Sequence, residues 1–272
     1  MRRRSILQLG LLALLIFGTA LAFQGRWRPN PWEEDDPAPI PPDAKEKTEY
    51  QFSRLRYPSI RGRRGRRRRG WGETWFTDYP KADRQFLQGV RRLTRVHARS
   101  MEEVVDLESD NNEIYYHPWI YAVETGHWDL PEDQAAKLRE YLLRGGFLMT
   151  DDFHGTAEWE VFMASLREVF PNRPVVDIEN SDPIFHVLYD LDHRFQVPGI
   201  QFLRSGRTYE YDGFEPEWKA VYDDHNRVMV AICHNMDLGD AWEWADDPEY
   251  PERYASLAYR VGVNYIIYAM TH

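Results

Sequence analysis

The chain has 272 residues and a formal net charge of -10 at pH 7. An acidic chain repels nucleic-acid phosphates, so the overall charge argues against a nucleic-acid-binding protein. The single cysteine, Cys233, excludes an internal disulfide and a zinc site built from several cysteines. After the N-terminal segments described next, roughly 220 residues remain, a length that fits one domain better than two.

The N-terminus has the features of an export signal. Arginines at positions 2–4 precede an apolar run over residues 6–23, and Ala20-Leu21-Ala22 matches a small-x-small cleavage site. We therefore expect a signal peptide over residues 1–22 and a protein that works in the periplasm or elsewhere outside the cytoplasm. The same run, eighteen residues long and interrupted by Gln8, is barely long enough to span a membrane, so an uncleaved anchor is the alternative. Arg3-Arg4 partly matches a twin-arginine signal, so both the Sec and the twin-arginine routes stay open.

Two further segments differ from a folded domain in composition. Residues 23–49 are rich in proline and acidic residues, which predicts a semi-extended tether before a domain over residues 50–272. Within that domain, Arg61–Arg69 consists of seven arginines and two glycines, which predicts a solvated loop. This loop is either a tolerated insertion or a contact for an anionic surface such as lipid headgroups.

The first half of the domain alternates strand and helix patterns. Residues 52–57 alternate in the manner of a strand, and Lys81–Leu93 places its apolar residues on one face of a helix. A short strand is expected at Glu103–Leu107. Trp119–Val123 is continuously apolar, which is typical of a strand buried on both faces of a sheet.

The pattern continues in the second half. Pro131, followed by two acids, opens a helix that ends at Gly145-Gly146, before a strand at Phe147–Thr150. A helix over Ala157–Phe170 and a short strand over Val175–Ile178 follow.

Two strands, Ala220–Tyr222 and Val228–Cys233, then flank a polar turn, and a helix over Tyr254–Met270 ends the chain. Strands alternating with helices predict an α/β fold, a three-layer sandwich with a mainly parallel sheet.

Polar clusters follow three of the predicted strands. The candidate ligand-binding residues in them are Glu124, His127, Asp151, Asp152, His154, Asn235, Asp237, Trp242 and Glu243. Because ligands bind at the carboxyl ends of parallel strands, we expect these groups to converge on one edge of the sheet. They suit a hydroxyl-rich ligand, acid–base chemistry or a metal ion, with His127, Asp152 and His154 as the first metal candidates.

Structural interpretations compete with each of these. Asp152 or Thr156 can cap the helix that starts near Ala157. The Trp242-Glu243-Trp244 segment can stack on a sugar or can simply cover the sheet edge. Asp78 and Asp83 can join the same rim or only fix the first helix. No Gly-x-Ser-x-Gly elbow or glycine-rich phosphate loop is present, so the sequence assigns no nucleophile and no cofactor.

Several short motifs carry a family resemblance. They are Trp75–Asp83, Thr125–His127, Leu142–Asp152, Asp182–His186 and Asn235–Glu243. In this order they resemble a bacterial family catalogued as domain of unknown function 4159, over about residues 50–271. The resemblance implies a flavodoxin-like sheet similar to class I glutamine amidotransferases, in proteins that are exported or attached to a membrane. Amidotransferases carry a thiol at a strand-to-helix turn, whereas Asp151-Asp152-Phe153-His154 occupies that turn here, so thiol-based glutamine hydrolysis is not expected.

Three hypotheses for the function follow. The first is an exported domain that binds a small polar ligand, carbohydrate included, or an envelope protein partner at the strand ends. The second is a hydrolase or metal-assisted enzyme that uses Asp151, Asp152, His154, His127 and Glu243. The third is a structural component of the envelope. Whether the protein is an enzyme is left open.

Overall fold

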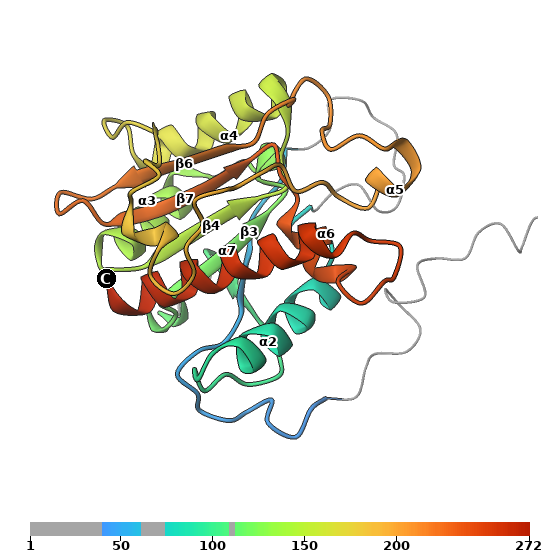
Figure 1. The fold of residues 1–272 in the computed structure, drawn as a ribbon. Coiled ribbons are helices and arrows are strands. Elements are labelled where there is room, and N and C mark those ends of the chain that lie inside the picture. The colour runs from blue at the N-terminus through green and yellow to red at the C-terminus, as the bar shows by residue number, and fades with distance from the viewer. Residues whose placement is uncertain (1–39, 61–73, 109–111) are drawn as a thin grey trace, which may run out of the picture. The chain divides into compact units, whose positions relative to one another are not determined.

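A seven-stranded sheet forms the middle layer of the protein (Figure 1). The computed structural model describes residues 40–60, 74–108 and 112–272. The strands are β1 (Ser53–Arg56), β2 (Glu103–Asp106), β3 (Trp119–Val123), β4 (Phe147–Asp151), β5 (Val176–Asp177), β6 (Glu217–Tyr222) and β7 (Val228–His234). Their order is β2-β1-β3-β4-β7-β6-β5. β2, β1, β3, β4 and β7 are parallel, whereas β6 is antiparallel to β7 and β5 to β6, which confirms the predicted mainly parallel sheet.

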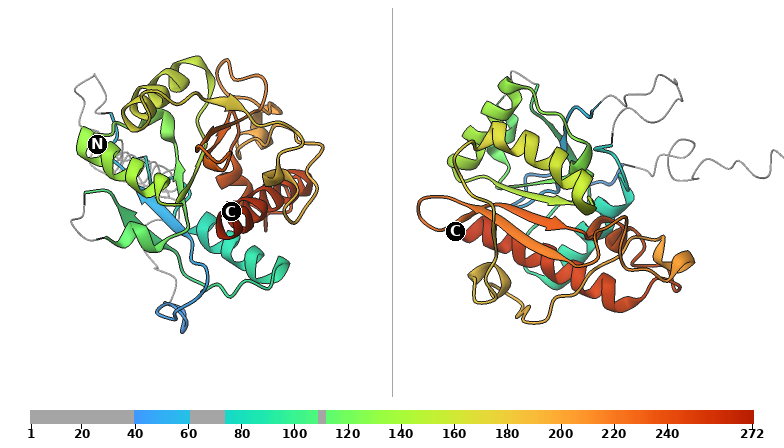
Figure 2. Two further views of the ribbon diagram at one scale, coloured as in Figure 1. Left: turned by 90° about the vertical axis from the view of Figure 1, so that its left-hand side faces the viewer. Right: turned by 90° about the horizontal axis from the view of Figure 1, so that it is seen from above.

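Helices cover both faces of this sheet (Figures 1 and 2). They are α2 (Lys81–Leu93), α3 (Glu132–Leu143), α4 (Gly155–Val169), α5 (Phe202–Ser205), α6 (Leu238–Glu243) and α7 (Glu252–Thr271), with short 3-10 turns η1 (Glu113–Tyr116), η2 (Thr125–His127) and η3 (Pro183–Phe185). α3 and α4 pack on one face, and α2, α6 and α7 on the other. The predicted three-layer α/β sandwich is therefore correct.

Burial on both faces explains the continuous apolar run of β3. Trp119, Tyr121 and Val123 belong to the core layer against α2 and α7, whereas Ile120 and Ala122 belong to the layer against α3 and α4. Every residue of β3 is buried. β3 and α2 have the limits predicted from the sequence, because their hydrophobic patterns are strong and uninterrupted.

Other elements differ from prediction in ways that bear on the site. β6 begins at Glu217, three residues before its predicted start at Ala220, because Glu217 and Trp218 pair with His234 and Cys233 of β7. α4 begins at Gly155 rather than Ala157. The helix α6 directly follows the turn after β7, and its six residues are all buried.

Several predicted segments lie outside the described residues. These are the signal peptide over residues 1–22, most of the tether over residues 23–49, and the arginine-rich loop Arg61–Arg69. Residues 41–272 form one compact unit. Among the residues that the structure describes, no helix has both the length and the apolar character needed to cross a membrane.

A buried ion pair joins β1 to α2. β1 lies between β2 and β3, so Arg54 is fully buried. Its guanidinium binds the buried Asp83 carboxylate, with the Nε atom 2.9 Å from Oδ2. Its Nη1 atom donates to the carbonyl oxygens of Trp75 (3.1 Å) and Thr77 (2.9 Å). Burial alone would lower the pKa of Arg54, but the Asp83 carboxylate raises it, so the guanidinium stays charged. One side chain thereby fixes α2 and the segment just before Asp78.

We expect Arg54→Met to lower the free energy of unfolding by about 3–5 kcal/mol, because it leaves the Asp83 carboxylate buried without its partner. The double variant Arg54→Met/Asp83→Leu should recover much of this loss, since it removes both charges. Urea unfolding of the three proteins measures the difference. A single variant within about 1 kcal/mol of the wild type would show that the pair does not hold α2 in place.

Candidate functional site

Three turns lie next to one another at the carboxyl edge of the sheet. Glu124, Asp152 and Asn235 directly follow β3, β4 and β7, and each has a positive φ (54°, 52° and 63°). The Glu124 N–H donates to Asp151 (3.0 Å), and the Asp152 N–H donates to Met236 (3.0 Å), in both cases to the carbonyl oxygen. Asp and Asn tolerate the left-handed conformation better than other residues with a side chain, so Glu124 is the most strained of the three, and such strain is concentrated at functional sites.

Acidic side chains from three segments gather at this edge. We call them the acidic cluster: Asp78, Asp151, Asp152, Asp237, Asp240 and Glu243. Asp78 precedes α2, Asp151 ends β4 and Asp152 follows it, and the last three come from the start and body of α6. Five of the six carboxylates add to the electrostatic repulsion that acts on at least one other member of the cluster: Asp78, Asp151, Asp152, Asp240 and Glu243.

Asp151 attaches α6 to the sheet. It is fully buried, and its Oδ2 atom accepts hydrogen bonds from the Tyr121 hydroxyl (2.9 Å) and from the backbone N–H groups of Leu238 (2.8 Å) and Gly239 (3.0 Å). Its Oδ1 atom is buried and has no hydrogen-bond partner in the part of the chain that the structure describes. Burial raises the pKa of Asp151 to about 7 despite these donors.

Asp237 and Asp240 both have structural partners. The Asp237 Oδ1 atom accepts a hydrogen bond from the Asp240 N–H (2.8 Å) and so caps α6. The Asp240 Oδ2 atom accepts from the Ile200 N–H (2.6 Å), and its Oδ1 atom accepts from the Trp244 indole N–H (3.2 Å). Burial, and then the charges of Asp152 and Asp240, raise the pKa of Asp237 well above its usual value.

Asp78 differs because its side chain forms no hydrogen bond and no ion pair with the described residues, and its Oδ2 atom is buried. Its φ is 61°. One oxygen each of Asp78, Asp237 and Asp240 lies within 4.8 Å of the others. Burial, and then the charges of Asp240 and Glu243, raise the pKa of Asp78 well above its usual value. From the sequence, Asp78 was expected only at the rim or as a support for the first helix.

The histidines named from the sequence bind separate acids. The His127 Nδ1 atom lies 2.9 Å from Glu124 Oε2, and the Glu124 hydrogen bond raises the pKa of His127. The His154 Nε2 atom lies 3.2 Å from Asp152 Oδ1, and burial lowers the pKa of His154 to about 3. In the part of the chain that is described, His127, Asp152 and His154 do not form one group of metal-ligating atoms.

Neither Asp152 nor Thr156 caps α4, contrary to one structural interpretation of the sequence. The Gly155 N–H donates to Asn235 Oδ1 (2.8 Å), and the Thr156 N–H donates to Asp212 Oδ1 (2.9 Å). The side chains that satisfy the first N–H groups of α4 therefore come from later parts of the chain. Asn235 is fixed further because its amide nitrogen donates to the Glu215 carbonyl (2.9 Å).

Trp242 cannot serve as a stacking platform in this structure. Its side chain is fully buried, and its ring packs on Phe86 (centroid separation 4.4 Å) and Tyr121 (5.3 Å) in the core. The neighbouring Glu243 is also buried, and burial together with Asp240 raises its pKa to about 7. Trp242 and Glu243 therefore pack as part of α6 rather than line an exposed rim, whereas Trp244, just after the helix, is half-buried.

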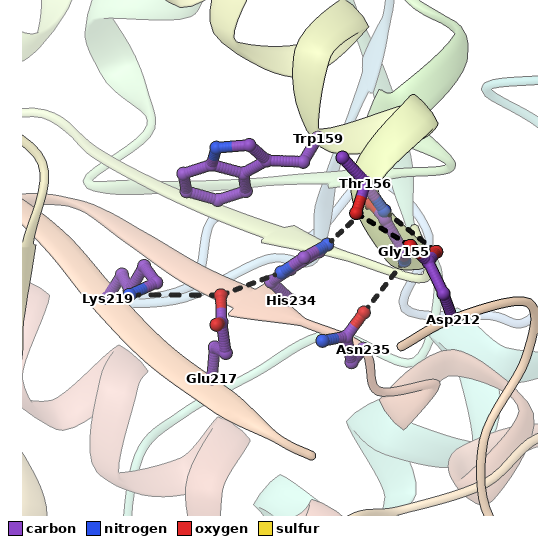
Figure 3. A pocket seen from close by; sticks show the side chains of 8 residues that line it. All are labelled: Gly155, Thr156, Trp159, Asp212, Glu217, Lys219, His234 and Asn235. Carbon is purple, nitrogen blue, oxygen red and sulfur yellow. Dashed lines mark hydrogen bonds and ion pairs between the residues drawn. The ribbon is translucent and has the colours of Figure 1, made fainter. Parts of the chain in front are cut away.

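A polar pocket of about 310 Å³ opens beside the start of α4 (Figure 3). Its lining residues are Gly155, Thr156, Trp159, Asp212, Glu217, Lys219, His234 and Asn235. The His234 Nδ1 atom lies 2.9 Å from Glu217 Oε2, which is directly opposite in the β6–β7 register, and its Nε2 atom lies 3.2 Å from the Gly155 carbonyl oxygen. The Trp159 and His234 ring centroids are 4.8 Å apart.

Of these lining residues, the sequence identified only Asn235 as a ligand candidate. Glu217 and Lys219 were missed because β6 was predicted to start at Ala220. Their alternation with Trp218 and Ala220, which are buried, is the signal that could have found them.

A family model for a domain of unknown function (DUF4159) matches residues 51–270. The chain belongs to this family. The match covers nearly the same range as the resemblance noted from the sequence motifs. Among curated proteins, no match was found. The family description names no activity, so the function of this DUF4159 domain has to be argued from its site.

The only cysteine of this DUF4159 domain is not available as a nucleophile. Cys233 is fully buried within β7, and burial raises the pKa of its thiol well above the usual value. A thiol in such surroundings behaves as a small hydrophobic side chain.

The acidic cluster should make the stability of the DUF4159 domain fall as the pH rises from about 4 to about 7. Asp151 and Glu243 have pKa values raised to about 7 in the folded state, from 3.8 and 4.5. In this window the folded state holds protons that the unfolded chain has released, so each group contributes a slope of about -1.4 kcal/mol per pH unit. Its contribution is fully present below about pH 4.

Urea unfolding in the presence of a chelator tests this expectation. The variant Asp151→Asn/Glu243→Gln should show a less negative slope than the wild type between pH 4 and pH 7, because it removes both titrating groups. Equal slopes for the two proteins would contradict the assignment of raised pKa values to these carboxyls.

Proposed function

We propose that this DUF4159 domain binds a small, hydroxyl-rich ligand, a sugar unit of a carbohydrate, in the polar pocket beside α4 (Figure 3). The observation that carries the proposal is the combination of an aromatic wall with hydrogen-bonding side chains of both kinds around a volume of about 310 Å³. This volume is at the lower end for small-molecule sites, which is appropriate for one sugar ring.

The chemistry of the lining supports a polyhydroxyl ligand. The indole ring of Trp159 offers an apolar surface on which the C–H face of a sugar can pack. Glu217 and Asp212 present carboxylate oxygens that accept from hydroxyl groups, and Lys219 presents an ammonium group that donates. A hydroxyl group both donates and accepts hydrogen bonds. A pocket lined by both donors and acceptors therefore suits a hydroxyl-rich ligand better than it suits a purely cationic or anionic one.

The pocket is held in place before any ligand arrives. Both ring nitrogens of His234 face acceptor oxygens, of Glu217 and of the Gly155 backbone. Asp212 is fixed by the Thr156 N–H (2.9 Å) and hydroxyl (2.6 Å) at the first turn of α4. Side chains that are already ordered lose little conformational entropy on binding, which favours affinity for a small ligand.

The proposal is one of binding rather than catalysis. The thiol of Cys233 is buried, and neither serine nor cysteine lines the pocket. Its carboxylates, Asp212 and Glu217, are held by hydrogen bonds to Thr156 and His234. We also retain the sequence-based proposal that the domain works outside the cytoplasm, where carbohydrate polymers of the cell envelope are accessible. The basic N-terminus and the apolar run over residues 6–23 support it.

We expect a panel of monosaccharides and envelope oligosaccharides to contain a ligand that raises the melting temperature of the purified protein and binds in isothermal titration calorimetry. Trp159→Ala should weaken that binding about tenfold or more, because it removes the apolar wall. Glu217→Gln should also weaken it, since an amide replaces the stronger acceptor.

The matched control is Tyr116→Ala, which removes an 80 % exposed aromatic side chain that precedes β3, away from the pocket. It should bind as the wild type does. Binding by Trp159→Ala equal to that of the wild type, or no binding by any carbohydrate of the panel, would refute the proposed function.

A further inference from the structure

We propose that Asp78, Asp237 and Asp240 form a binding site for a hard divalent cation, of the class Mg²⁺, Mn²⁺ or Ca²⁺. This site lies within the acidic cluster and shares no residue with the proposed carbohydrate pocket. The inference is therefore independent of the proposed function.

The three carboxylates converge from two segments far apart in the sequence. Asp78 comes from the turn before α2, which Arg54 holds through the carbonyl oxygens of residues 75 and 77. Asp237 and Asp240 come from the start of α6, which Asp151 holds through two backbone N–H groups. One oxygen from each of the three carboxylates lies within 4.8 Å of the others, which is close enough for one ion to contact all three.

Two buried oxygen atoms of the acidic cluster have no hydrogen-bond partner among residues 40–60, 74–108 and 112–272. The Asp78 side chain forms no hydrogen bond within these ranges, and its buried Oδ2 atom would lie 2.7 Å from a Cβ atom placed on Gly239, at the start of α6. The Oδ1 atom of Asp151, a fully buried residue, is also unpartnered. A buried polar atom without a partner is costly, and an ordered water molecule or a bound ion satisfies it.

In the described part of the chain, the charge of Arg54 acts on Asp78 but no ion pair neutralises the three carboxylates. Among the described residues, no lysine or arginine forms an ion pair with the three carboxylates. Arg54 pairs with Asp83, and Lys81 pairs with Asp246. Backbone N–H groups bind Asp237 and Asp240, which explains why these aspartates hold α6 in place. These N–H groups carry no net charge, and they do not bind Asp78. A divalent cation would supply the missing positive charge.

The donor atoms decide which cation fits. A Cβ atom on Gly199 would lie 2.3 Å from Asp237 Oδ2, 2.5 Å from Gln201 Oε1 and 2.7 Å from Asp240 Oδ2. Only glycine leaves room at this position. The amide carbonyl oxygen of Gln201 therefore lies close to the two carboxylates. This set offers oxygen and neither imidazole nor thiolate. Oxygen-only sets bind Mg²⁺, Mn²⁺ and Ca²⁺, whereas zinc sites use mainly nitrogen and sulfur ligands.

Mn²⁺ titrated into the full chain, freed of metal by a chelator and dialysed at pH 7.5, tests the site by isothermal titration calorimetry. We expect one Mn²⁺ per chain and a raised melting temperature. Asp78→Asn should weaken Mn²⁺ binding about tenfold or more, because it removes one of three ligand charges. This variant loses no hydrogen bond, so it should melt in chelator at or above the temperature of the wild type.

The charge-matched control is Glu168→Gln, an exposed residue in the last turn of α4. It should bind Mn²⁺ as the wild type does. The proposal is overturned if the wild type binds no Mn²⁺, Mg²⁺ or Ca²⁺ at millimolar concentration. It is also overturned if Asp78→Asn, folded by circular dichroism, binds Mn²⁺ as tightly as the wild type.

Discussion

Carboxylates crowded at the carboxyl edge of a parallel sheet are the constraint on which the site depends. β3, β4 and β7 run in the same direction, so the turns that follow them are neighbours, and backbone hydrogen bonds link each turn to the next. The chain places acids in these turns and in α6, where they are buried. Burying like charges together costs free energy unless protons or a cation compensate. The raised pKa values of Asp151 and Glu243 and the unpartnered oxygens are two consequences of this one arrangement.

The rest of the fold holds this arrangement in place. Arg54, buried in β1, holds both α2 and the segment that ends at Asp78. Asp151, at the end of β4, binds the first N–H groups of α6, and Asp237 caps the same helix. Hydrogen bonds and one ion pair thus keep acidic side chains close together even though their charges repel one another. A protein whose acids served only for solubility would leave them exposed instead.

The layers of the fold could be predicted from the sequence because they depend on strong local patterns. β3 is apolar throughout and α2 is amphipathic, so both were found with their limits. The burial of Arg54 could not be predicted, because it depends on the position of β1 inside the sheet rather than on its own alternating sequence. The burial of Trp242 in the core also depends on the three-dimensional packing, so the sequence left open whether this residue forms part of an exposed binding surface.

The site could be predicted only in outline. Strand ends carrying Glu124, Asp152 and Asn235 were recognisable, because the site of a parallel sheet lies at its carboxyl edge. The pairing of Glu217 with His234 requires the register of two strands, and the approach of Asp78 to Asp240 requires contacts between α2 and α6. Such non-local contacts leave no periodic signal in a single sequence.

The pocket beside α4 and the acidic cluster therefore occupy one edge of the sheet but differ in chemistry. The pocket mixes donors, acceptors and an aromatic ring, whereas the cluster offers only oxygen acceptors. The most direct test of the central claim is anomalous diffraction at the manganese absorption edge from crystals grown with Mn²⁺. The account predicts one strong peak bounded by Asp78, Asp237 and Asp240. Well-ordered crystals with no peak there, or with peaks only at surface carboxylates, would contradict it.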